Sequence, residues 1–147
     1  MERTCVIVKP DGVCKNNAGA VIARLQQEGL RLIGIKMERP SRNKIEQFYA
    51  IHKGKHFFGP LIKFMTSAPI IVMAWEGKGA IKMVREAIGA TNSLEAAPGT
   101  LRRMYGTDGR RNLVHASDSP ENGLIETRFF FSESEVFEYG ADDWNIQ

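Results

Sequence analysis

The segment Ile70-Ile71-Val72-Met73-Ala74-Trp75 contains no polar side chain. A strand with one face in water alternates apolar and polar residues, whereas a strand covered on both faces is apolar throughout. We therefore predict that this segment is a central strand of a sheet. The short helical pattern that precedes it ends before Pro69, because the residue before a proline disfavours the helical conformation.

Three further segments are predicted to be strands. The first is Thr4 to Val8, a β-branched apolar run followed by Pro10-Asp11-Gly12, which we expect to form a turn. The second runs from Leu30 to Met37, and the third from Ile125 to Phe131.

Helical spacing of apolar residues and capping signals predict the helices. Ser41 is a candidate N-cap, and Gly29 is a candidate C-terminal cap. Ser119-Pro120-Glu121 combines a cap, a first-turn proline and an acid near the positive helix end. The predicted helices are residues 18–25, 41–49, 61–65 and 80–88, a brief helix from Ser119, and a last short helix from the capping-box pattern at Ser132 to Glu135.

The order of these elements is β-α-β, two inserted short helices, then β-α-β. This order predicts an α+β fold of the ferredoxin-like βαββαβ type, with a four-stranded antiparallel sheet, helices on one face and an inserted helical hairpin. The sequence has no repeat and no linker, so we expect a single domain over residues 1–147.

Composition narrows the functional classes. The longest apolar stretch is far shorter than the roughly 20 residues that cross a bilayer, so no membrane partner is expected. Cys5 and Cys14 lack the further ligands of a zinc site, and Cys5 lies in an apolar run, so we interpret it as a core residue. A reduced, cytoplasmic location is the default expectation.

Charge is unevenly distributed along the chain. All 20 Lys and Arg side chains lie in residues 1–131, together with only 12 of the 17 acidic ones, which gives this part a net charge of +8. A basic body suggests an anionic ligand, either nucleotide or nucleic acid. On charge alone, a solubilising surface explains the pattern equally well.

The segment from Ala90 to Ser119 is long and irregular, which in a compact domain is typical of a functional loop. It is rich in Arg, Asn and Thr, which suit phosphate and sugar groups. It also contains His115, a candidate nucleophile, with Glu126 and Asp118 as candidate carboxylate partners. A purely structural histidine stays an open alternative. The sequence contains neither a P-loop nor the protein-kinase motifs.

The stretch Asn112-Leu113-Val114-His115-Ala116-Ser117-Asp118-Ser119 resembles the active-site signature of nucleoside diphosphate kinases. The likeness extends over nearly the whole chain. Four other motifs follow the order found in that family: Lys9-Pro10-Asp11-Gly12-Val13, Phe57-Phe58, Gly89-Ala90-Thr91-Asn92 and Pro98-Gly99-Thr100-Leu101-Arg102.

This resemblance implies a ping-pong reaction. His115 takes the γ-phosphate from a nucleoside triphosphate such as ATP and passes it to a nucleoside diphosphate. Glu126 and Ser117 are implied to fix the histidine, and Tyr49 to lie near the transferring group. The implied nucleotide-binding residues are Lys9 (also catalytic), Arg85 and Arg102 for the phosphates, Thr91 for the β-phosphate side, Asn112 with Lys9 for the ribose, and Phe57 for the base.

The resemblance also implies Mg²⁺ as cofactor, held mostly by the nucleotide's own phosphates rather than by protein ligands. It implies a homo-oligomer, either hexamer or tetramer. Two positions depart from the common pattern: Ala116 stands where glycine is frequent, and Ser93 where proline is frequent. Neither removes a catalytic group.

Two other functions fit the sequence less well. A nucleic-acid-binding module of this fold needs aromatic and basic residues on an exposed sheet face, which the Ile70–Trp75 strand does not offer. No specific nucleic acid partner is therefore expected. An inactive relative is disfavoured because every catalytic position is filled.

Overall fold

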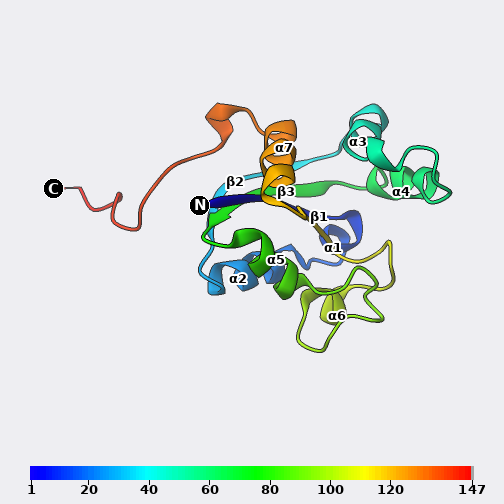
Figure 1. The fold of residues 1–147 in the computed structure, drawn as a ribbon, viewed down its shortest axis with the longest axis horizontal. Coiled ribbons are helices and arrows are strands. Elements are labelled where there is room, and N and C mark those ends of the chain that lie inside the picture. The colour runs from blue at the N-terminus through cyan, green and yellow to red at the C-terminus, as the bar shows by residue number, and fades with distance from the viewer. Residues whose placement is uncertain (147) are drawn as a thin grey trace.

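A computed structural model describes residues 1–146; Gln147, the last residue of the predicted domain, lies outside the described residues. The sheet has four strands in the order β2-β3-β1-β4, and every pair is antiparallel. The strands are β1 (Glu2–Val8), β2 (Arg31–Glu38), β3 (Ile70–Gly77) and β4 (Val114–Ala116). The predicted ferredoxin-like α+β fold is confirmed (Figure 1).

The prediction of a central apolar strand is also confirmed. β3 pairs with β1 on one side and with β2 on the other. Met73, Ala74 and Trp75 are completely buried. Because both faces of β3 are covered, it offers no exposed platform on which bases of a nucleic acid stack.

Helices cover both faces of the sheet, so the expectation of helices on one face is wrong (Figure 1). One layer contains α2 (Ala18–Gln27) and α5 (Ala80–Ile88), packed against Val6 and Val8 of β1. The other contains α3 (Arg42–Phe48), α4 (Phe58–Met65) and α7 (Pro120–Phe130), packed against Cys5 and Ile7. Alternate residues of β1 face opposite sides, so one strand serves two cores.

The predicted fourth strand, Ile125 to Phe131, is wrong. These residues form the second half of α7 up to Phe130, a helix of 11 residues rather than the brief one expected. Its buried residues Gly123, Thr127 and Phe130 recur at helical spacing, and the side chain of Ser119 caps it by accepting the Asn122 N–H. The fourth strand is instead β4, which has only three residues and contains His115.

Two further local predictions are corrected. Pro10-Asp11-Gly12 is not a turn but the start of α1 (Pro10–Cys14), with the proline at the first helical position. The segment 90–119 is not wholly irregular, because it contains β4 and the helix α6 (Leu101–Tyr105), which Thr100 caps.

The other predicted elements agree with the structure to within a few residues. Gly29, with φ of 87°, follows α2, and the side chain of Ser41 caps α3. The capping box of Ser132 and Glu135 is present around a short 3₁₀ turn at Glu133–Glu135; a second such turn lies at Ala50–His52. Within residues 1–146, no helix combines the length and apolar character needed to cross a membrane.

Candidate active site

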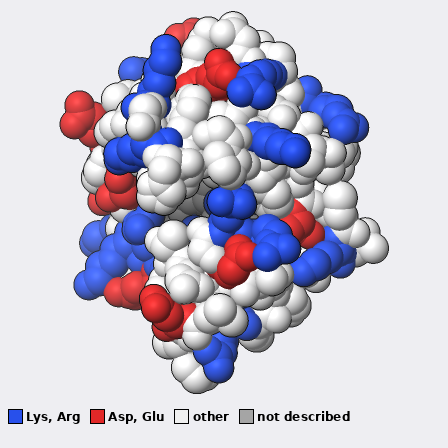
Figure 2. Space-filling view, turned by 90° about the vertical axis from the view of Figure 1, so that its right-hand side faces the viewer, with Lys and Arg blue, Asp and Glu red and all other residues white. Residues whose placement is uncertain are grey.

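A pocket of about 690 Å³ opens between the α3–α4 hairpin and the loop that precedes β4. Figure 2 shows a hollow in this side of the molecule, with Lys and Arg side chains on its rim. Nearly every predicted site residue lines this pocket, and so does Asp118, the second candidate for the carboxylate partner of His115. Those that line it are Lys9, Tyr49, Phe57, Arg85, Thr91, Arg102, Asn112, His115 and Glu126, while Ser117 is buried behind it.

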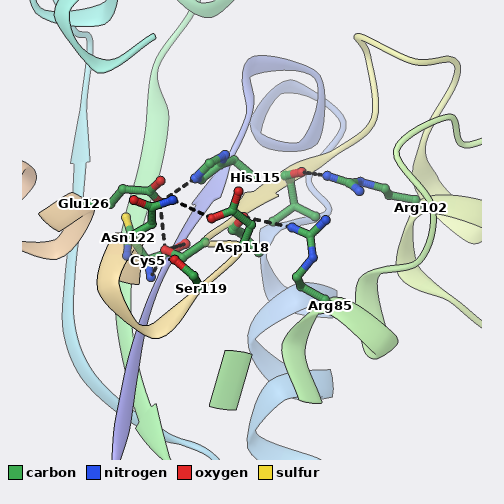
Figure 3. Close-up of polar contacts among 11 residues, drawn as sticks. Cys5, Arg85, Arg102, His115, Asp118, Ser119, Asn122 and Glu126 are labelled. Carbon is green, nitrogen blue, oxygen red and sulfur yellow. Dashed lines mark hydrogen bonds and ion pairs between the residues drawn. The ribbon is translucent and has the colours of Figure 1, made fainter. Parts of the chain in front are cut away.

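His115 lies on β4, opposite Ile7 of β1. Its neighbours Val114 and Ala116 face the α2–α5 core, so the alternation of the strand turns His115 toward α3 and α7. There its Nε2 lies 2.8 Å from Oε1 of Glu126 (Figure 3). This contact places the ring proton on Nε2, because a carboxylate oxygen accepts and does not donate. Nδ1 then keeps its lone pair.

Ser117 fixes the carboxylate of Glu126 from the other side. The Ser117 hydroxyl accepts the backbone N–H of Cys5 at 3.0 Å and donates its own proton to Oε1 of Glu126 at 2.7 Å. The same oxygen therefore accepts from both Ser117 and His115. Cys5 is completely buried, so its interpretation as a core residue is confirmed, and the same burial raises the pKa of its thiol.

Three basic side chains enter the pocket without a carboxylate partner. Arg102 donates to the backbone carbonyls of Gly89, Asn112 and Val114, at 3.0, 3.3 and 2.7 Å. Arg85 donates to the carbonyl of Ala116 at 3.3 Å, and Lys9 Nζ donates to Oδ1 of Asn112 at 2.7 Å. None of the three forms an ion pair within residues 1–146.

This arrangement concentrates positive charge. The pKa of Lys9 is lowered to about 7, mainly by burial and secondly by the positive charge of Arg102. The pKa of Arg102 is lowered to about 10, mainly by burial and secondly by the positive charge of Arg85. An anionic ligand stabilises like charges that lie together without an ion pair. The two-pronged guanidinium group of arginine matches the oxygens of a phosphate.

Asn112 connects the loop to the rest of the pocket. Its amide nitrogen donates to the carbonyls of Thr91 at 2.9 Å and Gly109 at 3.2 Å, while its amide oxygen accepts from Lys9. The next residue, Leu113, has φ of 76° and donates its N–H to Asp11 at 2.9 Å. These bonds hold the loop against the end of β1.

Two aromatic residues stand on the α3–α4 side. Tyr49 is buried at the end of α3; its hydroxyl has no partner within residues 1–146, and burial strongly raises its pKa. It therefore stays a neutral phenol that is free to donate. Phe57 directly precedes α4, with the ring of His52 centred 5.2 Å away.

The structure decides between the two candidate carboxylates. Glu126, not Asp118, contacts His115, whereas Asp118 accepts from the side-chain amide of Asn122 at 2.6 Å. Asn122 also lines the pocket and was not predicted as a site residue. Its signal was the four-residue spacing of Asp118, Asn122 and Glu126, which indicates one face of a helix. Assigning residues 125–131 to a strand hid this pattern.

Protein ligands for a metal ion are sparse. Nowhere in residues 1–146 do three His, Cys, Asp or Glu side chains come together in an arrangement suited to a metal. The carboxylate of Glu126 is engaged by His115 and Ser117, and that of Asp118 by Asn122. A metal ion at this site therefore needs most of its oxygen ligands from a bound molecule.

Comparison with known proteins places the chain among enzymes of one kind. The family model described as nucleoside diphosphate kinase matches residues 2–136. A nucleoside diphosphate kinase of Picosynechococcus sp. is 50% identical over 136 residues, which are 92% of this chain and 91% of the relative.

Solved structures give the same result. A nucleoside diphosphate kinase from Halobacterium salinarum, in complex with CDP, matches with a TM-score of 0.93 and 40% identity, covering 96% of this chain and 94% of that one. The Aquifex aeolicus nucleoside diphosphate kinase matches with a TM-score of 0.90 and 44% identity, covering 92% and 99%.

Proposed function

This chain belongs to the nucleoside diphosphate kinase family, and we propose that the pocket around His115 is where it moves phosphate between nucleotides. The enzyme transfers the γ-phosphate of a nucleoside triphosphate to a nucleoside diphosphate by a ping-pong mechanism. The observation that carries the assignment of the site is that Ser117, Glu126 and His115 are hydrogen-bonded in series beside three basic side chains that form no ion pair within residues 1–146.

In the first half-reaction, the Nδ1 lone pair of His115 attacks the γ-phosphorus of the triphosphate. A nitrogen–phosphorus bond forms, the bond from phosphorus to the β–γ bridging oxygen breaks, and the diphosphate leaves with that electron pair. Glu126 holds the Nε2 proton throughout and stabilises the positive charge that develops on the ring. In the second half-reaction, a terminal oxygen of another diphosphate attacks the same phosphorus and Nδ1 leaves.

The remaining residues position the nucleotide and neutralise its charge. Positioning and charge neutralisation account for most of the catalysis of phosphoryl transfer. Tyr49 donates its free hydroxyl toward the transferring group. The other assigned roles are Arg85, Arg102 and Lys9 on the phosphates, Thr91 on the β-phosphate side, Asn112 with Lys9 on the ribose, and Phe57 stacked on the base.

Mg²⁺ is the proposed cofactor, and it would enter bound to the phosphate oxygens of the nucleotide. The absence of a three-ligand metal cluster in residues 1–146 fits this mode of binding, because Mg²⁺ in such sites relies on substrate phosphates. When bound, it neutralises phosphate charge.

Three broader assignments accompany this function. We place the enzyme in the cytoplasm and treat residues 1–147 as one domain. We also assign it a closed homo-oligomeric state, hexamer or tetramer. The acidic C-terminal segment, which begins at Ser132, supports the assignment of an oligomer because it exposes the aromatic side chains of Phe137, Tyr139 and Trp144.

Transfer from ATP to GDP tests the proposed site. His115→Ala should bind nucleotide but lose transfer, because the substitution removes the Nδ1 lone pair that attacks the phosphorus. His56→Ala is the matched control, since His56 is exposed and does not line the pocket, and it should keep wild-type rates. Substantial transfer by His115→Ala would falsify the role of His115.

A further inference from the structure

Asp118 and Arg85 both line the pocket, yet they do not form an ion pair. Asp118 lies in the turn between β4 and α7, and Arg85 reaches the pocket from α5. In the view of Figure 3 the Asp118 carboxylate lies between Asn122 and Arg85. Both residues are exposed, so burial does not prevent their side chains from turning toward each other.

Asn122 holds the carboxylate instead. Its Nδ2 donates to Oδ1 of Asp118 at 2.6 Å. This hydrogen bond is the largest cause of a lowered pKa of Asp118, and the charges of Arg85 and His115 lower it further. Asp118 is therefore an ionised carboxylate near both the nucleophile and a basic side chain.

Arg85 is left with a weak partner. The only hydrogen bond of its guanidinium within residues 1–146 goes to the carbonyl of Ala116, at 3.3 Å. A carboxylate that turned toward this guanidinium would compete with a phosphate for the same donors. An ionised carboxylate released into the pocket would also repel the phosphate by its charge.

We propose that Asn122 is a positioning residue, whose neutral amide holds the Asp118 carboxylate away from Arg85 and so keeps Arg85 available for the nucleotide phosphates. An amide suits this task because it donates to a carboxylate without bringing another charge into the pocket. The inference rests on the proposed function, since it assumes that Arg85 binds phosphate.

Asn122 is separable from the fold of α7. The capping bond at this position uses the backbone N–H of Asn122, which donates to the Ser119 hydroxyl at 3.1 Å. Truncating the side chain to alanine keeps that bond and removes only the bond to Asp118. The variant should therefore keep the helix and lose the restraint on the carboxylate.

The test is steady-state kinetics with saturating ATP and varied GDP. Asn122→Ala should raise the KM for GDP about three- to fivefold, with kcat within about twofold of wild type, because competition by one exposed ion pair is worth at most about 1 kcal/mol. Adding Asp118→Asn to Asn122→Ala should return the KM to within about twofold of that of Asp118→Asn alone, because the competing charge is gone.

An unchanged KM in Asn122→Ala overturns the inference. It is equally overturned if the double variant is as impaired as Asn122→Ala, because Asn122 then acts through the fold rather than through the charge of Asp118. Arg85→Ala checks the premise: an unchanged KM in Arg85→Ala removes Arg85 from phosphate binding and overturns the inference, whereas only the loss of the role of His115 overturns the proposed site.

Discussion

Lys9 shows how a single residue links burial to substrate binding. It is 7% exposed, and its ammonium group lies near Arg102 with only the Asn112 amide as a hydrogen-bond partner. A buried ammonium that forms no ion pair is costly in the free protein. A bound phosphate supplies the missing negative charge, so nucleotide binding should raise the free energy of unfolding.

We predict that the free energy of unfolding rises with pH above neutrality when no nucleotide is present. The pKa of Lys9 is about 7 in the folded protein and near 10.5 in the unfolded chain, so between these values the unfolded chain binds more protons. Stability therefore increases as pH rises through this window. Chemical denaturation at pH 7 and pH 9 measures it, with Lys9→Met as the control that should flatten this part of the profile. An identical profile in Lys9→Met contradicts the assignment.

Arg102 tests whether geometry matters as well as charge. It places three guanidinium nitrogens against three backbone carbonyls, which aims the group into the pocket. Arg102→Lys keeps the charge but loses this fixed fork. We expect kcat/KM to fall at least roughly tenfold, or about 1.4 kcal/mol of transition-state stabilisation. Wild-type kinetics in this variant would remove Arg102 from the site.

At the scale of elements, α7 brings the catalytic carboxylate to the histidine. It crosses β1 so closely that Gly123 has no room for a side chain: an added Cβ would lie 2.0 Å from the backbone oxygen of Arg3. Glu126 lies one turn further along the same helix. The position of Glu126 relative to His115 therefore depends on this contact between helix and strand.

Gly123→Ala should displace α7 and weaken both fold and activity. The contact is with backbone, which cannot rotate away, so we expect destabilisation of about 1–3 kcal/mol or more, together with a fall in kcat. Gly19→Ala is the matched control, because Gly19 is also helical but an added Cβ meets nothing within 4 Å. It should be neutral or stabilising by about 1 kcal/mol. Thermal unfolding and transfer rates of both variants decide the matter.

The same helix explains what the sequence could and could not predict. The run Ile125 to Phe131 carries two β-branched residues and three phenylalanines, which favour a strand locally. The helix is favoured by its packing on β1 through Gly123. That contact joins residues far apart in the sequence, so a local pattern does not reveal it. β4 was missed because its three residues are too few to show a period. The central strand β3, apolar throughout, was predictable.

Most site residues were predicted through the resemblance to the family rather than from local pattern. The resemblance named nine of the residues that line the pocket, among them Tyr49, Arg85 and Glu126, which lie outside the quoted motifs. Asn122 lies outside those motifs, and its partner Asp118 was considered only for His115. The hydrogen bond between them became visible once α7 had placed both side chains.

At the scale of the molecule, the C-terminal segment leaves the body of the domain (Figure 1). Within residues 1–146, its one hydrogen bond to the sheet between two backbone groups runs from the Phe137 N–H to the carbonyl of Ile33, at 2.9 Å. Beyond Phe137, Trp144 and Ile146 are 78% and 87% exposed. Large apolar side chains exposed on an acidic segment suit a docking surface on a basic neighbour. A second copy of this chain, basic over residues 1–131, has that charge.

We predict a closed homo-oligomer that dissociates more readily when the residues after Gly140 are deleted. Truncation removes Trp144 and Ile146 from the proposed contact and leaves the described domain core intact. Light scattering over a range of concentrations compares the two proteins. A monomeric full-length protein contradicts the assembly, and an unchanged oligomer after truncation contradicts the role of the segment alone.

The central claim is that His115 carries the phosphate covalently. The most direct measurement is the intact mass of the protein after incubation with ATP and Mg²⁺ and removal of nucleotide. We predict one added phosphoryl group, acid-labile and alkali-stable as a phosphohistidine is, that disappears when GDP is added and never forms in His115→Ala. An unmodified wild-type mass under conditions in which the protein transfers phosphate from ATP to GDP, or an equal phosphoryl gain in His115→Ala, would contradict the account.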